Sequence, residues 1–187
     1  RHHIFSKLVF MLSFADSFKS CPRCGFQAPT LREERSLLCP ACSFEFFFNP
    51  AGAVGGFLFY EGQLLLGIRD RDPRGGYLDV PGGFIDFEES AEGGLERELL
   101  EEFNLRSGPL HYLCSAPNVY PYGGVPYRTL DLFFWGYLES LEGLKAGDDV
   151  RESLLIEPHQ LNPDRLAFES TRRAFIRLMA SGVLDRL

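Results

Sequence analysis

The sequence predicts an α/β protein in which a mixed α/β domain follows a small module that contains four cysteines. Apolar runs rich in β-forming residues at 53–60 and 63–69, separated by a two-residue polar turn, predict a β-hairpin. Apolar residues at helical spacing predict one helix at 88–103 and a final amphipathic helix at 169–181. Strands and helices that alternate in this way are typical of a mixed sheet with helices packed on it.

The chain divides into three predicted parts: a helical leader at 1–20, the cysteine module at 21–49 and the α/β domain at 50–187. Its 187 residues suffice for one sizeable core and a small appendage, and 45% hydrophobic content is that of a folded protein. The remaining predicted strands of the α/β domain lie at 77–80, 110–114, 128–138 and 151–156.

The charge of the chain limits its partners. The formal net charge is -7, which argues against a broad nucleic-acid surface and against binding to a membrane surface. We therefore expect a small-molecule partner, and an anionic one would need metal ions in order to approach.

An apolar run in residues 1–18 could be mistaken for a signal peptide or a membrane span. It is too short to span a bilayer, because Lys7 and Asp16 interrupt it, and it lacks a convincing A-x-A cleavage site. The pattern favours an amphipathic helix.

Four cysteines are spaced as C-x2-C, fourteen residues and C-x2-C, at Cys21, Cys24, Cys39 and Cys42. This zinc-ribbon spacing lets two pairs of thiolates reach one tetrahedral ion. The alternative is two disulfides in a secreted domain, but the rest of the chain is typical of a cytoplasmic enzyme, whose thiols stay reduced. Cys114, in an apolar segment, is interpreted as a small buried hydrophobe.

The predicted zinc is structural, because four thiolates fill its coordination sphere and leave no position for water. Binding of nucleic acid by the ribbon is the less favoured alternative, since its basic and acidic residues are mixed. We expect the three phenylalanines at 46–48 to pack the two modules together, or to pack between the subunits of a homodimer.

The predicted helix at 88–103 carries a cluster of carboxylates. Glu98 and Glu102 lie one turn apart on one face, and Glu101 lies beside them. Like charges at this spacing repel, so a cation between them would stabilise the helix, and clustered oxygen ligands suit Mg²⁺ or Mn²⁺. The alternative is a solvated acidic face.

The residues around these carboxylates resemble the Nudix box, G-x5-E-x7-R-E-U-x-E-E-x-G-U, in which U is an aliphatic residue. The matching positions are Gly83, Glu89, Arg97, Glu98, Leu99, Glu101, Glu102 and Leu105. The chain departs from the box at Asn104, where the family has a glycine. Because asparagine also tolerates the left-handed conformation that ends a helix, the departure is conservative.

The resemblance implies the Nudix α/β/α sandwich with a mixed β-sheet, and hydrolysis of a diphosphate by a metal-activated water. It makes Glu98 and Glu102 the principal metal ligands and Glu101 a further ligand or an acceptor for water. The carbonyl of Gly83 is expected to complete the metal shell.

Two other box residues are expected to act on the loop. Arg97 is expected to point elsewhere on the helix and to pair with Glu89, which would fix the loop before the helix. The box does not identify the general base.

A zinc ribbon directly before a Nudix domain resembles the NADH pyrophosphatases, which carry an S-Q-P-W-type motif after the box. Here the motif reads Ser-Ala-Pro-Asn at 115–118, so the glutamine and the tryptophan are replaced. The replacements weaken the case for NADH and leave other dinucleotides and nucleotide sugars open. The predicted substrate-binding residues are Ser115, Asn118, Tyr120 and Tyr122. Ordinary loop packing is the alternative for the tyrosines.

Asp149 stands before the last strand, where related enzymes place an extra metal-binding carboxylate; a solvated turn is the alternative. The expected function is therefore divalent-metal-dependent hydrolysis of a nucleoside diphosphate linked to another moiety, of the NAD(H), ADP-ribose or nucleotide-sugar type. The products would be a nucleoside monophosphate and the phosphorylated remainder. The alternatives are a non-catalytic nucleotide sensor and a hydrolase that acts on nucleotide-capped RNA.

Overall fold

The computed structural model describes residues 17–33, 35–147 and 149–186. They form two compact units, one of residues up to 50 together with 119–127, and the other of 51–118 together with 128–187. Most of the predicted amphipathic helix at 1–18 lies outside the described residues. No helix of the described part is long and apolar enough to cross a membrane.

The first unit contains a small antiparallel sheet with the strand order β1-β2-β3. Its strands are β1 (Thr30–Arg32), β2 (Ser36–Leu38) and β3 (Glu45–Phe47). Phe18 packs against Phe46 and Phe48 with ring centroids 5.5 and 5.4 Å away, and the Phe47 side chain is exposed. Packing of the three phenylalanines against the α/β domain or a second subunit stays a prediction.

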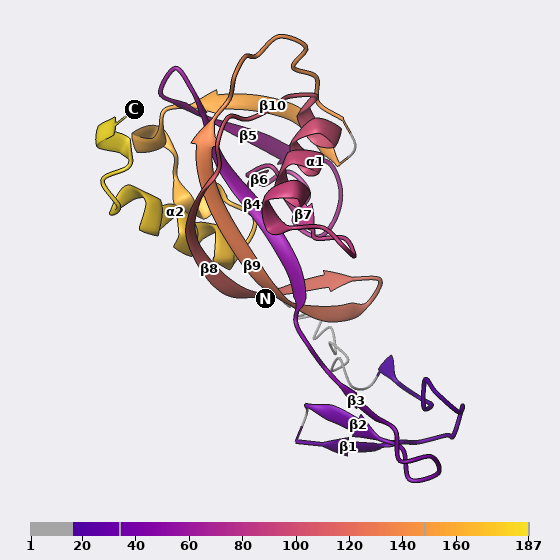
Figure 1. Ribbon diagram of the computed structural model, residues 1–187. Helices are drawn as coiled ribbons and strands as arrows, with labels where there is room; N and C mark the ends of the chain where they lie inside the picture. Colours follow the sequence, from indigo (N-terminus) through magenta and orange to yellow (C-terminus); the bar gives the residue numbers. More distant parts are fainter. Residues whose placement is uncertain (1–16, 34, 148, 187) are drawn as a thin grey trace, which may run out of the picture. The chain divides into compact units, whose positions relative to one another are not determined.

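A seven-stranded mixed sheet and two helices form most of the α/β domain (Figure 1). The strands are β4 (Ala51–Tyr60), β5 (Gln63–Arg69), β6 (Leu78–Asp79), β7 (Gly82–Phe84), β8 (His111–Tyr122), β9 (Val125–Tyr137) and β10 (Val150–Ile156). The helices are α1 (Ala91–Phe103), α2 (Glu169–Met179) and the short 3₁₀ turns η2 (Pro158–Gln160), η3 (Pro163–Arg165) and η4 (Leu184–Arg186).

The main strand order is β10-β5-β4-β9-β8, with β6 paired to β5 and β7 paired to β4. Strands β4 and β9 run parallel, whereas β4 is antiparallel to β5 and to β7. The sheet is therefore mixed, as the sequence predicts, and the β4–β5 hairpin turns at the expected residues.

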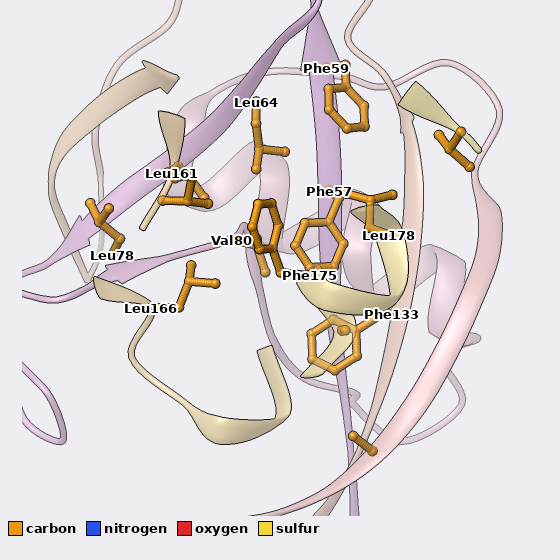
Figure 2. Packing of buried hydrophobic residues seen from close by; sticks show 14 residues of the cluster. Phe57, Phe59, Leu64, Leu78, Val80, Phe133, Leu161, Leu166, Phe175 and Leu178 are labelled. Atoms are coloured by element: carbon orange, nitrogen blue, oxygen red, sulfur yellow. The ribbon is translucent and has the colours of Figure 1, made fainter. Parts of the chain in front are cut away.

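The central strand β4 buries both of its faces, because successive side chains of a strand point to opposite sides. Phe57 and Phe59 pack in one cluster with Phe175 of α2 (Figure 2), and Leu58 packs in another with Leu99 of α1. The two helices thus cover opposite faces of the sheet. This is the α/β/α sandwich that the sequence predicts.

Helix α1 begins three residues later than predicted, because Ser90 is its N-cap. The Ser90 hydroxyl accepts a hydrogen bond from the backbone N–H of Gly93 at 3.1 Å. The helix ends at Asn104, which has a φ of 54° in the left-handed region, as predicted from the sequence. The Ser90 cap therefore fixes the first turn of the helix that carries the three glutamates.

Strand β8 is more than twice as long as the predicted segment at 110–114. It continues to Tyr122 through Pro117 and Pro121, both beyond the predicted segment. Proline is tolerated there because β8 is the last strand in the sheet order, and an edge strand has one side on which no N–H donor is needed.

Candidate functional site

The turn between β6 and α1 brings the backbone of two glycines against the carboxylates of α1. In strand β7, Gly82 pairs with Gly55 of β4, and Gly83 pairs with Val54. A Cβ atom on Gly83 would lie 2.3 Å from Oε1 of Glu98, so the Glu98 carboxylate lies directly against this glycine. The structure thus brings Gly83 and Glu98 together, as the box predicts.

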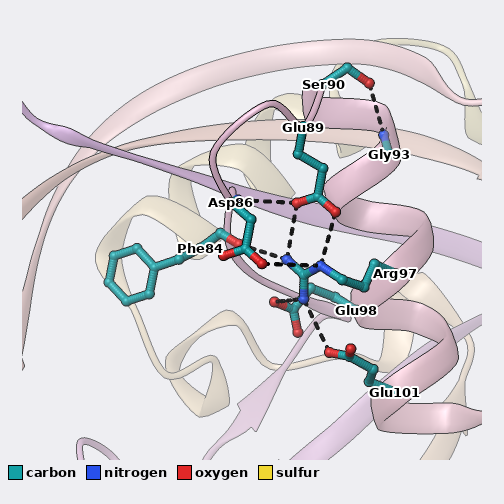
Figure 3. Close-up of polar contacts among 8 residues, drawn as sticks. All are labelled: Phe84, Asp86, Glu89, Ser90, Gly93, Arg97, Glu98 and Glu101. Atoms are coloured by element: carbon teal, nitrogen blue, oxygen red, sulfur yellow. Dashed lines mark hydrogen bonds and ion pairs between the residues drawn. The ribbon is translucent and has the colours of Figure 1, made fainter.

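Arg97 lies at the centre of a network of carboxylates (Figure 3). Its guanidinium donates to both oxygens of Glu89 at 2.9 and 3.2 Å, so the predicted pair is present. It also donates to Glu98 at 2.8 Å, to Glu101 at 3.1 Å and to the carbonyl of Phe84 at 2.9 Å. The hydrogen bonds that Glu89 accepts from Arg97 and from the N–H of Asp86 lower the pKa of Glu89. Arg97 therefore does not point elsewhere on the helix, as expected from the sequence, but links the loop to the acidic face.

Glu102 faces a different partner from the other two carboxylates. Its Oε2 accepts a hydrogen bond from the N–H of Gly82 at 3.1 Å. Burial, helped by the nearby carboxylates of Glu98 and Asp79, raises the pKa of Glu102 to about 8, against the effect of the Gly82 hydrogen bond. A buried carboxylate that resists ionisation is stabilised by a cation.

A small pocket of the α/β domain collects three carboxylates and one guanidinium, those of Asp79, Glu102, Asp149 and Arg69. Arg69 donates to Asp79 at 3.2 Å, and Asp149 forms an ion pair with Arg71. Burial raises the pKa of Asp79 to about 6, although Arg69 opposes the shift. The structure therefore brings Asp149 and Glu102 to one pocket.

Asp79 and Arg69 were not predicted from the sequence. A signal for Asp79 was present, because it is an acidic residue between two buried apolar residues, Leu78 and Val80, two positions before Pro81. Arg69 ends strand β5 and gave no such signal, since a cation at the end of a strand is ordinary.

The carboxylates of Glu98, Glu101 and Glu102 do not converge on one point. In the part of the chain that the structure describes, only the four cysteines place three or more potential ligand atoms within 4.8 Å of one another. Glu98 and Glu101 bond to Arg97, while Glu102 bonds to Gly82. The oxygen donors and the buried acidic pocket fit a hard divalent ion. Metal binding by the three glutamates together stays a prediction.

The four cysteines have the geometry of a tetrahedral thiolate site. Sγ of Cys21 lies 3.8 Å from that of Cys42, and Sγ of Cys24 lies 3.6 Å from that of Cys39. Four sulfurs at about 2.3 Å from a tetrahedral zinc lie roughly 3.8 Å apart, so the spacing matches. All four are free thiols, and this cluster could bind zinc.

The predicted substrate-binding residues all lie on strand β8. Ala116, at one of the two altered positions of the motif, is buried in the core on the side of α2, whereas Ser115 is exposed. By strand alternation Asn118 lies on the side of Ala116. The rings of Tyr120 and Tyr122 stack at 6.4 Å. Ser115 and Asn118 therefore face opposite sides, and the binding roles of the set stay predictions.

Replacing Gly83 by Ala tests whether the close contact between Gly83 and the Glu98 carboxylate sets the position of Glu98. The new Cβ would overlap the Glu98 carboxylate, which can rotate away because it is a flexible side chain. We expect the variant to fold with a melting temperature close to that of the wild type and to bind Mn²⁺ about 10-fold or more weakly, as when a supporting contact of a metal ligand is lost. Mn²⁺ titration and thermal denaturation would measure both. Unchanged Mn²⁺ binding would contradict the expectation.

A family model described as the NUDIX domain matches residues 49–179. The chain is 32% identical over 129 residues to the ADP-ribose pyrophosphatase of Methanocaldococcus jannaschii, covering 67% of this chain and 72% of that one. It is also 32% identical over 114 residues to the NAD-capped RNA hydrolase NudC of Yersinia enterocolitica, covering 61% of this chain and 43% of that one. The chain thus spans less than half the length of this RNA hydrolase.

Solved structures share the fold. A NUDIX hydrolase from Nitrosomonas europaea superimposes with a TM-score of 0.68 at 25% identity, covering 88% of this chain and 92% of that one. The NUDIX domain of Shewanella oneidensis NrtR, solved with ADP ribose, has a TM-score of 0.58 at 20% identity, covering 72% and 90%. The second likeness concerns the fold alone.

Proposed function

Because this chain belongs to the NUDIX domain family, we propose that it is a divalent-metal-dependent pyrophosphohydrolase. The observation that carries the proposal is the buried carboxylate of Glu102, which lies in one pocket with two further carboxylates and accepts the N–H of the glycine turn. Such a group is costly to ionise without a cation beside it. The arrangement is suited to a site that is completed by a cation and an anionic substrate.

In this proposal Glu98, Glu101 and Glu102 hold the divalent ions, with Asp149 and the carbonyl of Gly83 as further ligands. When bound, Mg²⁺ or Mn²⁺ would neutralise charge on the diphosphate oxygens and lower the pKa of the attacking water. The Arg97 guanidinium keeps the Glu98 and Glu101 carboxylates oriented through its own hydrogen bonds.

Arg97 and Glu89 together fix the loop that precedes α1. Glu89 accepts the N–H of Asp86 at 3.1 Å while both of its oxygens bond to the guanidinium. One guanidinium, that of Arg97, thus bonds both to Glu89 of the loop and to Glu98 and Glu101 of the helix. We propose that the pair positions the metal ligands and does not touch the reacting atoms.

The proposed substrate is a nucleoside diphosphate linked to another moiety, such as ADP-ribose, NAD(H) or a nucleotide sugar. The names of the pyrophosphatase and RNA-hydrolase relatives support this class, since both describe compounds with an adenosine diphosphate moiety. The stacked rings of Tyr120 and Tyr122 are proposed to bind a base.

A second candidate is hydrolysis of nucleotide-capped RNA, which the names of the NudC relatives favour. The net charge of -7 counts against a broad RNA contact, so binding would be limited to the capped end. A non-catalytic nucleotide sensor is less favoured, because the chain keeps the box glutamates.

Chromatographic product analysis over a substrate panel would test the function. The panel is NADH, NAD, ADP-ribose, ADP-sugars, dinucleoside polyphosphates, deoxynucleoside triphosphates and an NAD-capped RNA, each with Mg²⁺ and Mn²⁺ in turn. We expect a nucleoside monophosphate from at least one linked diphosphate and no turnover with a chelator. Tight binding of ADP-ribose without turnover under either ion would instead indicate a sensor. Preferred turnover of the capped RNA would support the second candidate.

We further propose that the cysteine cluster binds structural zinc and has no part in the chemistry, because its four thiolates would fill the coordination sphere. Free thiols held for zinc fit the cytoplasmic location that we propose for this enzyme. A homodimer is proposed as the assembly that would cover the exposed Phe47.

A further inference from the structure

The segment between β9 and β10 lies against the C-terminal end of α1. The N–H of Lys145 donates to the carbonyl of Phe103 at 3.1 Å, and the N–H of Gly147 donates to the carbonyl of Glu102 at 2.8 Å. These are two of the carbonyls that a helix leaves without partners at its end. The residues 141–147, which we name the capping loop, therefore complete the helix that carries the acidic face.

Asn104 anchors the capping loop through its side chain. Its Nδ2 donates to the carbonyl of Gly143 at 2.9 Å, while its own backbone ends the helix at a φ of 54°. A glycine at this position would adopt the same backbone conformation but would lose the side-chain hydrogen bond. The one departure of this chain from the box thus adds a contact that the box residue cannot make.

The capping loop fits closely between this anchor and the helix. A Cβ on Gly143 would lie 3.0 Å from Nδ2 of Asn104, and a Cβ on Gly147 would lie 2.8 Å from the carbonyl oxygen of Glu101. Leu141 and Leu144 of the loop pack against the same hydrophobic cluster as the end of α1. Glycines at the two close contacts and the packing of Leu141 and Leu144 keep the loop in one place.

The capping loop ends two positions before Asp149 in the sequence. The backbone carbonyl of Asp149 accepts the N–H of Asp70 at 2.8 Å, and its side chain pairs with Arg71. Gly147 bonds to the backbone of Glu102, and the carboxylates of Asp149 and Glu102 line the same pocket.

We propose that Asn104 is a positioning residue that holds the capping loop against α1 and thereby sets the distance between the carboxylates of Asp149 and Glu102. The inference rests on the proposed function, in which both carboxylates serve the divalent ions. Asn104 itself touches neither the ions nor the substrate. Its effect is transmitted through Gly143, the loop and Gly147.

Replacing Asn104 by Gly tests the anchor, and Glu61→Gly is the matched control. Both residues have a positive φ, 54° and 48°, so each glycine relieves a similar backbone conformation, but Glu61 lies in the β4–β5 turn. In the metal-free protein, hydrogen exchange at the amides of Lys145 and Gly147 should become about fivefold faster in Asn104→Gly, the factor that one hydrogen bond supplies. The control should leave both amides unchanged.

Mn²⁺ binding without substrate provides the second measurement. The half-saturating concentration should rise about fivefold in Asn104→Gly and stay unchanged in Glu61→Gly, while kcat at saturating Mn²⁺ stays within about twofold of the wild type. In an Asp149→Ala background the added Asn104→Gly should have no further effect, because the residue through which it acts is gone.

The outcomes separate the inference from the proposed function. Unchanged exchange at Lys145 and Gly147, or an equal loss of Mn²⁺ affinity with and without Asp149, would overturn the positioning role of Asn104 in an active enzyme. If the wild type neither binds Mn²⁺ nor hydrolyses any of the panel, the proposed function fails and the positioning role with it. The exchange data would then still show whether Asn104 holds the loop.

Discussion

Glu102→Gln is expected to lower kcat/KM for the preferred substrate by about 100- to 1000-fold, which corresponds to roughly 3–4 kcal/mol of transition-state stabilisation. The amide keeps the shape of the side chain and removes the charge that would hold the ion. Glu96→Gln, an exposed residue of the same helix, is the control and should retain full activity. Steady-state kinetics over a Mg²⁺ and Mn²⁺ series would measure both. Activity within twofold of the wild type would rule out the proposed mechanism.

The same variant should be more stable than the wild type when no metal is present. Burial raises the folded-state pKa of Glu102 from 4.5 to about 8, so folding favours the protonated form. Below about pH 4.5 the carboxyl is protonated in both the folded and the unfolded state, so it does not lower the free energy of unfolding. As the pH rises, the loss of stability grows, and it becomes constant once the pH passes about 8. Glutamine removes the penalty.

We therefore expect the metal-free Glu102→Gln protein to melt on the order of 4–8 °C above the wild type at pH 8.5, from roughly 2 kcal/mol of relief, and close to it at pH 4.5. Calorimetry in a chelating buffer at the two pH values would measure the difference. A stability difference that is equal at both pH values would show that the ionisation of Glu102 is not its cause.

The elements that follow a simple pattern were predictable from the sequence. The hairpin of β4 and β5 has apolar strands on both sides of a polar turn, and α2 has one apolar stripe, so residue order alone carries the information. The long strand β8 was missed because Pro117 and Pro121 argue against a strand unless its place at the sheet edge is known. That place depends on pairing between distant segments.

The arrangement of the carboxylates, too, was only partly predictable from the sequence. Helical spacing places Glu98, Glu101 and Glu102 near one face, but it does not fix their side-chain torsions. The choice of partner, Arg97 for two of them and the Gly82 amide for the third, depends on how the glycine turn packs on the helix. Asp79 joins them only because β6 pairs with β5.

Gly82→Ala should cost more stability than any other glycine substitution near the site. A Cβ at this residue would lie 2.1 Å from the carbonyl oxygen of Val54 and 2.8 Å from Cα of Gly55, both backbone atoms of the central strand β4. Its φ of 153° is also a conformation that residues with side chains rarely adopt. Because β4 is packed on both faces, neither strand can move aside.

We expect Gly82→Ala to lower the free energy of unfolding by more than about 4 kcal/mol, so that little or no folded protein remains. Urea denaturation followed by far-UV circular dichroism would measure the loss. Gly62→Ala is the control, since it has a φ of 78° with no atom within 4 Å of the new Cβ, and should cost only about 1–2 kcal/mol. An equal loss of stability in the two variants would contradict the backbone clash.

Gly83→Ala provides a further comparison, because the three heavy atoms nearest to the new Cβ all belong to the side chain of Glu98. Of two adjacent glycines, Gly82 is thus expected to be required by the fold, whereas Gly83 is expected to matter for the position of Glu98.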